Sequence, residues 1–275
     1  MRSLLLVALI PAVLGAAPAL QIVKPIISQM EGGAPDPPGF THVPGETLYF
    51  SCRVAGFQQT SEEKVHLSFS VQAFDPQGVA LTELYRNEIV EEVSPKDKEW
   101  QPKIETELQI PPLVPTGAYK IIVKLEDQVA KASQELTVPF QVRGHDVETS
   151  ESLTVRNLHF FRNEDDTQPL AAAVYKPGSG VWARFDITGY KFGEGNKINV
   201  SYVTSVIAPS GKVLWTQPEP ATEQSESFYP KRYVAAAFGI TLQPNIRPGE
   251  YMIAVQVKDA VGNQTYEAKG AFTIQ

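Results

Sequence analysis

The chain contains the same module twice, and this duplication constrains its fold more than any other feature of the sequence. Residues 20–81 align with residues 153–214 without a gap, at a constant offset of 133, and residues 108–143 align with residues 240–275 at an offset of 132. The two blocks hold 10 identities in 62 pairs and 9 identities in 36 pairs. We therefore expect two related domains of about 125 residues, a size that allows each to bury its own core.

The most informative identical positions are turn residues. They pair Pro44-Gly45 with Pro177-Gly178, Gly56 with Gly189, Pro76 with Pro209, and Gly78 with Gly211. Glycine permits positive φ and proline presets φ, so both residues mark places where a chain reverses direction. The two halves are therefore expected to turn at the same intervals.

Between these turns the apolar residues alternate with polar ones. The alternating residues are Leu48, Phe50, Cys52 and Val54 in the first copy, and Val181, Ala183, Phe185 and Ile187 in the second. A period of two places such residues on one face of a strand. About seven strands per copy, without helical periodicity, predict an all-β protein made of two tandem antiparallel β-sandwiches.

The first 19 residues are typical of a secretory signal peptide. A short basic start is followed by an apolar run from Leu4 to Leu14, and small residues continue to Ala19. This order predicts export, and the run is shorter than the about 20 apolar residues of a membrane span. We therefore expect a secreted or periplasmic protein without a membrane span, divided into a signal peptide (1–19), module 1 (20–143), a linker (144–151) and module 2 (152–275).

Both modules repeat one series of turn motifs. Module 1 has Pro44-Gly45-Glu46, Gly56-Phe57, Pro76 with Gly78, and Pro115, Gly117, Tyr119 and Asp127; module 2 has Pro177-Gly178, Pro209-Ser210-Gly211, Pro248-Gly249-Glu250-Tyr251 and Asp259. In these motifs the chain resembles immunoglobulin-like and macroglobulin-like modules of secreted bacterial proteins, although it lacks the cysteine pair of antibody domains. The resemblance implies adhesion, spacing or ligand presentation, with no catalytic residues to carry over.

Cys52 is the only cysteine, so no disulfide can form within the chain. Its counterpart in the second copy is Phe185, which occupies an inward-facing position. We therefore interpret Cys52 as a small buried hydrophobic residue rather than as a reactive thiol.

The polar residues offer no catalytic or metal-binding pattern. The four histidines are His42, His66, His145 and His159, and no two of them have metal-ligand spacing. The acidic loop Glu164-Asp165-Asp166 is read as solvated, with Ca²⁺ binding as the alternative. Asp127 and Asp259 each follow a strand and are expected to cap turns, again with Ca²⁺ as the alternative. The sequence therefore predicts a protein that is not an enzyme and needs no metal and no cofactor.

The two copies differ most between residues 82–107 and 215–239. Aromatic and cationic residues gather there, as they do at protein interfaces. The candidate partner-binding residues are Trp100, Trp215, Phe228, Tyr229, Lys231, Arg232 and Tyr233. In the structural alternative, Phe228 and Tyr233 anchor the loop to the sandwich.

These observations favour a non-catalytic binding or structural protein that contacts its partner through the divergent loops. The partner would be a protein at the cell envelope or in the medium, or a glycan. The alternative function is a carbohydrate- or small-ligand-binding module that uses exposed Trp100, Trp215, Tyr229 and Tyr233. The net charge of −7 argues against nucleic acid as a partner.

Overall fold

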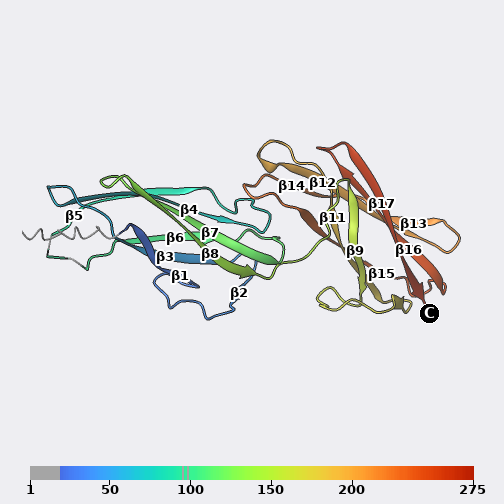
Figure 1. Cartoon of the computed structure of the whole chain (residues 1–275). Coiled ribbons are helices and arrows are strands. Elements are labelled where there is room, and N and C mark those ends of the chain that lie inside the picture. Colours follow the sequence, from blue (N-terminus) through green and yellow to red (C-terminus); the bar gives the residue numbers. More distant parts are fainter. Residues whose placement is uncertain (1–18, 95, 98) are drawn as a thin grey trace, which may run out of the picture.

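The structure is a computed structural model that describes residues 19–94, 96–97 and 99–275, so nearly all of the proposed signal peptide lies outside it. Within these residues the only helix is a single 3₁₀ turn, η1 (Glu194–Asn196), and every other regular element is a strand (Figure 1). The prediction of an all-β protein is therefore confirmed. No helix in the described part of the chain is long and apolar enough to cross a membrane.

Module 1 is a sandwich of two sheets. Its strands are β1 (Gln21–Ser28), β2 (Thr41–His42), β3 (Thr47–Ala55), β4 (Lys64–Phe74), β5 (Tyr85–Glu92), β6 (Lys103–Gln109), β7 (Gly117–Asp127) and β8 (Ala132–Val142). The smaller sheet has the order β1-β3-β6, and the larger sheet has the order β2-β8-β7-β4-β5.

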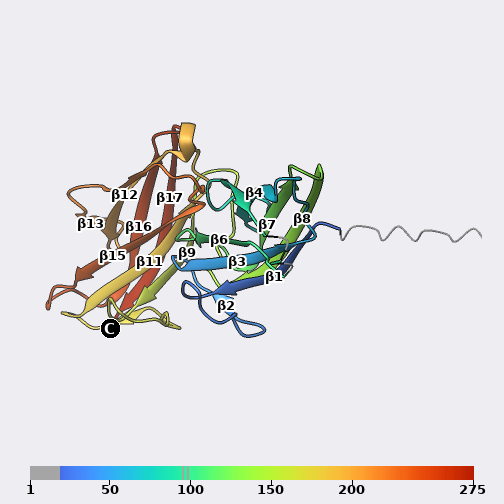
Figure 2. The same ribbon diagram turned by 90° about the vertical axis from the view of Figure 1, so that its left-hand side faces the viewer.

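Module 2 repeats this arrangement. Its strands are β9 (Thr154–Phe161), β10 (Val174–Tyr175), β11 (Gly180–Thr188), β12 (Ile198–Ile207), β13 (Val213–Thr216), β14 (Ala221–Ser225), β15 (Tyr233–Thr241), β16 (Gly249–Asp259) and β17 (Gln264–Ile274). The smaller sheet, β9-β11-β15, lies in front of the larger sheet, β10-β17-β16-β12-β13, in Figure 2. In the larger sheet of module 1 the edge strand beside β4 is β5; in module 2 two short strands, β13 and β14, take its place and both pair with β12.

The named strands pair in antiparallel fashion, as predicted, with two exceptions. In each module a strand of two residues runs parallel to the last strand: β2 pairs with β8, and β10 pairs with β17. The periodicity of the sequence does not reveal these ladders because two residues are too few to establish an alternation. Their occurrence at the same place in both modules is further support for the duplication.

The cores contain the residues expected from the alternation. Cys52 is buried in the core of module 1, and Phe185 is buried in the core of module 2. Burial raises the pKa of the Cys52 thiol to about 12. The interpretation of Cys52 as a core residue is therefore confirmed.

Two polar devices recur at corresponding positions. The hydroxyl of Tyr119 donates to the carbonyl oxygen of Pro115 at 2.7 Å, and that of Tyr251 donates to Arg247 at 2.8 Å, as in the tyrosine corner of immunoglobulin folds. The predicted carboxylate caps are also confirmed. Asp127 accepts from the backbone N–H groups of Gln58, Val129 and Ala130, and Asp259 accepts from those of Lys191 and Val261.

The strand register extends the repeat beyond the aligned blocks. Tyr49 lies opposite Glu107 on β3 and β6, and Trp182 lies opposite Gly239 on β11 and β15. Residues 103–107 therefore correspond to residues 235–239, at the same offset of 132 as the second block. The divergent regions expected from the sequence were 82–107 and 215–239. Their last residues lie on the equivalent strands β6 and β15, so the regions that differ in structure are shorter.

Candidate functional site

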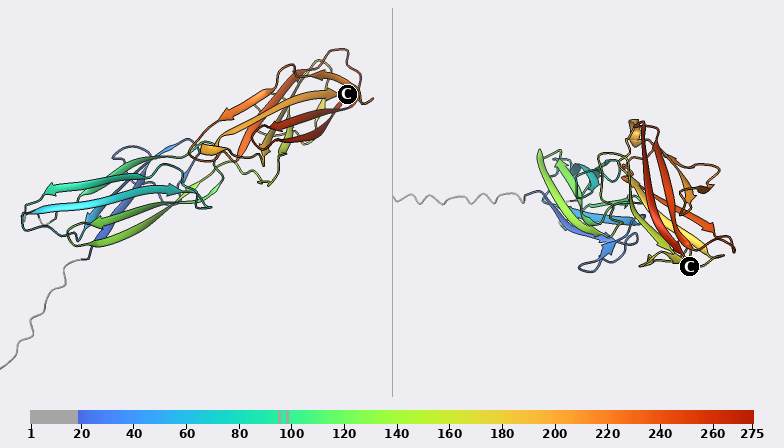
Figure 3. Two further views of the ribbon diagram at one scale, coloured as in Figure 1. Left: turned by 90° about the horizontal axis from the view of Figure 1, so that it is seen from above. Right: turned by 90° about the vertical axis from the view of Figure 1, so that its right-hand side faces the viewer.

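The two modules lie end to end (Figure 3), and the divergent loop of module 2 reaches across their junction. The receiving residue is Asp75, which directly follows β4. Its Oδ1 atom accepts from the backbone N–H groups of Gln77 at 2.9 Å and Val79 at 2.8 Å. One carboxylate oxygen thus closes a turn within module 1.

The other oxygen of Asp75 belongs to module 2. Oδ2 accepts from the hydroxyl of Tyr229 at 2.9 Å and from Nη2 of Arg232 at 2.5 Å. Nη1 of Arg232 also donates to the side chain of Gln77 at 3.1 Å. The carboxylate is completely buried and is satisfied by four hydrogen bonds, two from each module. We call Asp75, Gln77, Tyr229 and Arg232 the clasp.

Apolar contact accompanies the polar bonds of the clasp. Tyr229 is only 5% exposed and packs into the hydrophobic core of module 1, although it belongs to the loop before β15. The guanidinium of Arg232 lies 5.8 Å from the centre of the Tyr229 ring. Burial raises the pKa of the Tyr229 hydroxyl, with Arg232 opposing and Asp75 reinforcing this shift. The hydroxyl therefore stays protonated at neutral pH and can donate to Asp75.

The rest of module 2 holds this loop through its carbonyl groups. Thr188 donates to the carbonyl of Arg232 at 3.1 Å, and Asn196 donates to that of Phe228 at 2.7 Å. The Tyr190 hydroxyl donates to the carbonyl of Lys231. The ammonium group of Lys231 pairs with Glu223 and holds the pKa of that carboxyl below its usual range. These bonds within module 2 hold the loop in the conformation in which it contacts module 1.

Residues of the linker contact both modules. A Cβ at Gly144 would lie 1.8 Å from the carbonyl oxygen of Val114, so only glycine allows this close approach. The carboxylate of Asp146 accepts from the backbone N–H of Thr116 at 3.0 Å on the module 1 side. On the module 2 side, Nε2 of His145 lies 2.9 Å from the buried carboxylate of Asp186.

The predicted contact residues divide into two groups. Tyr229 and Tyr233 are 5% and 4% exposed, so the expectation that they offer exposed aromatic surface is wrong. The junction covers Tyr229, and the His145 ring packs 5.1 Å from that of Tyr233. The anchors of the loop are therefore Tyr229 and Tyr233, whereas Phe228 is 51% exposed.

The remaining predicted residues keep part of their surface. Trp215 is 40% exposed, and its ring lies 5.7 Å from that of Phe238. Trp100 is partly buried and packs edge-on against Phe57. No described contact brings either tryptophan to the loop around residue 229, so the predicted set does not form one surface.

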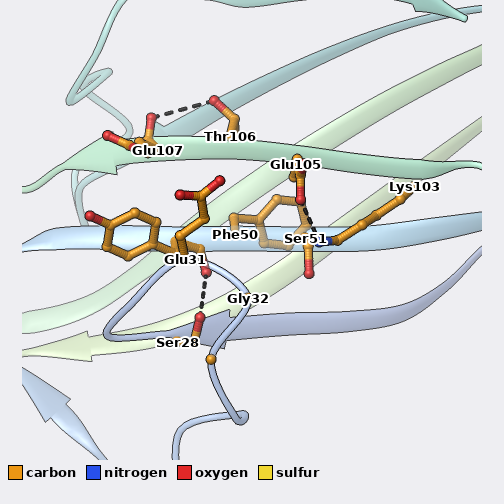
Figure 4. Close-up of a pocket in the computed structure, with 11 residues that line it drawn as sticks. Ser28, Glu31, Gly32, Phe50, Ser51, Lys103, Glu105, Thr106 and Glu107 are labelled. Carbon is orange, nitrogen blue, oxygen red and sulfur yellow. Dashed lines mark hydrogen bonds and ion pairs between the residues drawn. The ribbon is translucent and has the colours of Figure 1, made fainter.

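Two hollows occupy corresponding places on the outer faces of the smaller sheets. The hollow of module 1 has a volume of about 200 Å³ and includes Tyr49, Glu31, Glu105 and Glu107 in its lining. Figure 4 shows Glu31 reaching from its loop over β3 towards β6. Lys103 pairs with Glu105, so this hollow has an excess of negative charge.

The hollow of module 2 is larger, about 440 Å³, and has a different lining. His159, Arg184 and Asp186 supply polar groups, while Ala235 and Ala237 form a floor of small residues. Neighbouring Trp182 takes the place that Tyr49 has in module 1. The sequence places both aromatics on the strand parity opposite the core, and that parity was the available signal for an exposed site.

The acidic loop before β10 is held by the protein itself. The Asp166 carboxylate accepts from the backbone N–H groups of Arg162 and Asn163, and these bonds lower its pKa. The guanidinium of Arg184 donates to the carbonyls of Glu164 and Asp166. In the described residues no group of three or more His, Cys, Asp or Glu side chains is arranged to hold a metal ion.

No protein-family model matches the sequence, and no curated protein sequence matches it. Among solved structures, the C-terminal domain of the AgI/II polypeptide BspA from Streptococcus agalactiae is 10% identical, with a TM-score of 0.31 and coverage of 94% of this chain and 99% of that one. The C-terminal domain of the antigen I/II-family protein AspA from Streptococcus pyogenes is 10% identical, with a TM-score of 0.33 and coverage of 93% and 100%. A family 123 glycoside hydrolase from Clostridium perfringens is 13% identical, with a TM-score of 0.29 and coverage of 45% and 27%. These values are too low to support a conclusion about function.

Proposed function

We propose that the protein is a non-catalytic binding or structural protein of the cell envelope or the surrounding medium, exported by its N-terminal signal peptide. Its two immunoglobulin-like modules act as one unit and present their surfaces to a protein or glycan partner at a fixed spacing. The observation that carries this proposal is the clasp, in which one buried carboxylate of module 1 is shared with the loop of module 2.

The clasp supports this proposal because bending at the junction would be costly. Domains joined by small polar interfaces usually move relative to one another. Here a change of angle would strip two hydrogen bonds from Asp75 and expose Tyr229 to water. A buried charge that loses its partners is strongly destabilising. The surfaces of both modules would therefore reach a partner together, which lowers the entropic cost of binding.

Capture of the partner tests this function. The mature protein, immobilised through a C-terminal tag, is incubated with envelope extract and culture medium of its own source cells. We expect stoichiometric recovery of one protein or glycan. Replacing both clasp donors, in the double variant Tyr229→Phe with Arg232→Gln, should reduce recovery several-fold, because the modules then lose their fixed geometry.

The matched control is Lys269→Gln, which also removes a cation from module 2 but breaks only the exposed ion pair with Glu267. This control should recover the partner as the wild type does. Equal recovery by the clasp variant would show that the modules bind independently, and the absence of any stoichiometric partner would refute the binding function.

A further inference from the structure

The outer face of the β9-β11-β15 sheet carries an aromatic side chain in an unusual position. The Trp182 ring lies across the neighbouring strand at Gly239: a Cβ there would be 2.4, 2.5 and 2.7 Å from three consecutive carbons of the six-membered ring. Such nearly equal distances mean that the ring turns a face, not an edge, towards β15. Gly180 is also close, since its Cβ would be 3.2 Å from the indole nitrogen.

The flat position of Trp182 leaves the other face of its ring directed away from the strand. Among the described residues no aromatic ring and no cation stacks on this indole. Along β15 the surface continues over Ala237 and Ala235, which are exposed and small, into the hollow of about 440 Å³. An aromatic platform is thus followed by an open apolar floor.

Polar side chains form the other side of the hollow. Arg184 is held in place by the ring of Phe161, 4.4 Å below its guanidinium, and by two backbone carbonyls. The carboxylate of Asp186 is already bonded to His145 and Asn157. No carboxylate side chain of the described residues pairs with Arg184. The Asp186 carboxylate also lines the hollow, but His145 and Asn157 engage it, so the Arg184 guanidinium is the charged group that remains available to an anion.

We propose that this face of module 2 binds a polysaccharide built from carboxylate-bearing hexopyranose rings. The apolar C–H face of a pyranose would stack on the Trp182 indole, and the next ring would lie on the alanine floor. Its hydroxyl and carboxylate groups would then face His159 and Arg184. A mostly apolar hollow with a few fixed polar groups is the usual form of a ligand site. The inference rests on the proposed binding function and names one ligand class for it.

Module 1 provides an internal contrast at the same positions. Tyr49 corresponds to Trp182, but it faces Glu107 in place of Gly239, and Glu105 replaces Ala237. With Lys103 paired to Glu105, the remaining carboxylates Glu31 and Glu107 make this hollow negative and repel carboxylates. The same face of module 1 is therefore expected not to bind an acidic polysaccharide.

The test is affinity electrophoresis of the full mature chain in gels that contain polygalacturonate, with dextran gels as the neutral comparison. We expect retardation of the wild type by polygalacturonate only. Trp182→Ala should weaken the affinity at least tenfold. Ala237→Glu, which places the module 1 residue on the exposed floor, should do the same without touching the core. Circular dichroism melting shows that each variant is folded.

Tyr49→Ala is the control, because it removes the corresponding aromatic residue of module 1, outside this hollow; it should be retarded like the wild type. Equal retardation in dextran would overturn the charge preference. Absence of retardation in either gel, or undiminished binding by both Trp182→Ala and Ala237→Glu, would overturn the site. Neither variant touches the clasp, so a partner that is still captured while no saccharide binds would leave the proposed function standing.

Discussion

Two buried side chains show how position determines chemistry at the scale of a single residue. Cys52 lies in the hydrophobic core of module 1, and its thiol is held protonated by burial. Asp75 is equally inaccessible to solvent, but each of its carboxylate oxygens accepts two hydrogen bonds, so the buried carboxylate is fully satisfied. Burial in apolar surroundings therefore makes the Cys52 thiol unreactive. Burial with complete hydrogen bonding allows the Asp75 carboxylate to connect the two modules.

The Cys52 thiol should be unreactive in the native protein. Its pKa is raised to about 12 by burial, so almost no thiolate, the reactive form, is present near neutral pH. An aromatic disulfide reagent followed by absorbance should report no reaction at pH 8 over minutes, and stoichiometric reaction once the protein is unfolded in urea. Rapid labelling of the folded protein would mean that Cys52 is not in the core.

At the scale of elements, the ends of strands carry more specific chemistry than their centres. Asp127 ends β7 and Asp259 ends β16, and each carboxylate ties a distant backbone N–H to the turn that follows its own strand. The caps thereby connect the loop after β3 to β7, and the loop after β11 to β16. Each cap joins one sheet of a sandwich to the other.

Replacing Asp127 by Ala should destabilise the protein by about 3 kcal/mol, because buried N–H groups lose their acceptor. Asp166→Asn is the matched control in an exposed loop and should change stability by less than about 0.5 kcal/mol. Urea unfolding followed by tryptophan fluorescence measures both.

Excess Ca²⁺ should leave the melting temperature of the wild type unchanged; a rise of several degrees would indicate that these carboxylates bind the ion.

The strands and turns were predictable from the sequence because their signals are local. Alternation placed Cys52 in the core, and repeated Pro and Gly residues located the turns. The environment of Tyr229 was not predictable, since its acceptor Asp75 lies 154 residues earlier in the chain. An aromatic residue looks the same in a sequence whether it meets solvent, a partner or the neighbouring module. The Trp182 surface was missed because its position depends on the missing side chain of Gly239.

At the scale of the whole molecule, the clasp and the linker hold the same junction from two sides. The linker bonds to Thr116 and Asp186, while the clasp loop, about 80 residues later, returns to Asp75. Two connections that are far apart in sequence restrain rotation better than one. The molecule is therefore expected to behave in solution as a single elongated body.

Arg232→Gln should loosen this body. Asp75 would lose its cationic partner, and we expect a loss of about 2 kcal/mol in the stability of module 1. Small-angle X-ray scattering should show a broader distribution of interatomic distances than for the wild type. Lys269→Gln, which breaks only an exposed ion pair with Glu267, should leave both the scattering and the stability unchanged. If Arg232→Gln also leaves them unchanged, the linker alone sets the geometry.

The junction joins two module ends that differ in their residues, so the free ends of the molecule lack the groups that form the clasp. The position in module 2 that corresponds to Asp75 is Ala208, and the position in module 1 that corresponds to Arg232 is Trp100. The acceptor Asp75 and the donor Arg232 thus occur in one module each, and they are already bonded to one another within the chain. Head-to-tail contacts between copies of one protein generate open filaments when they do not close into rings. The two modules share one fold but have unlike ends, and this difference disfavours polymerisation of the repeated fold through its own junction.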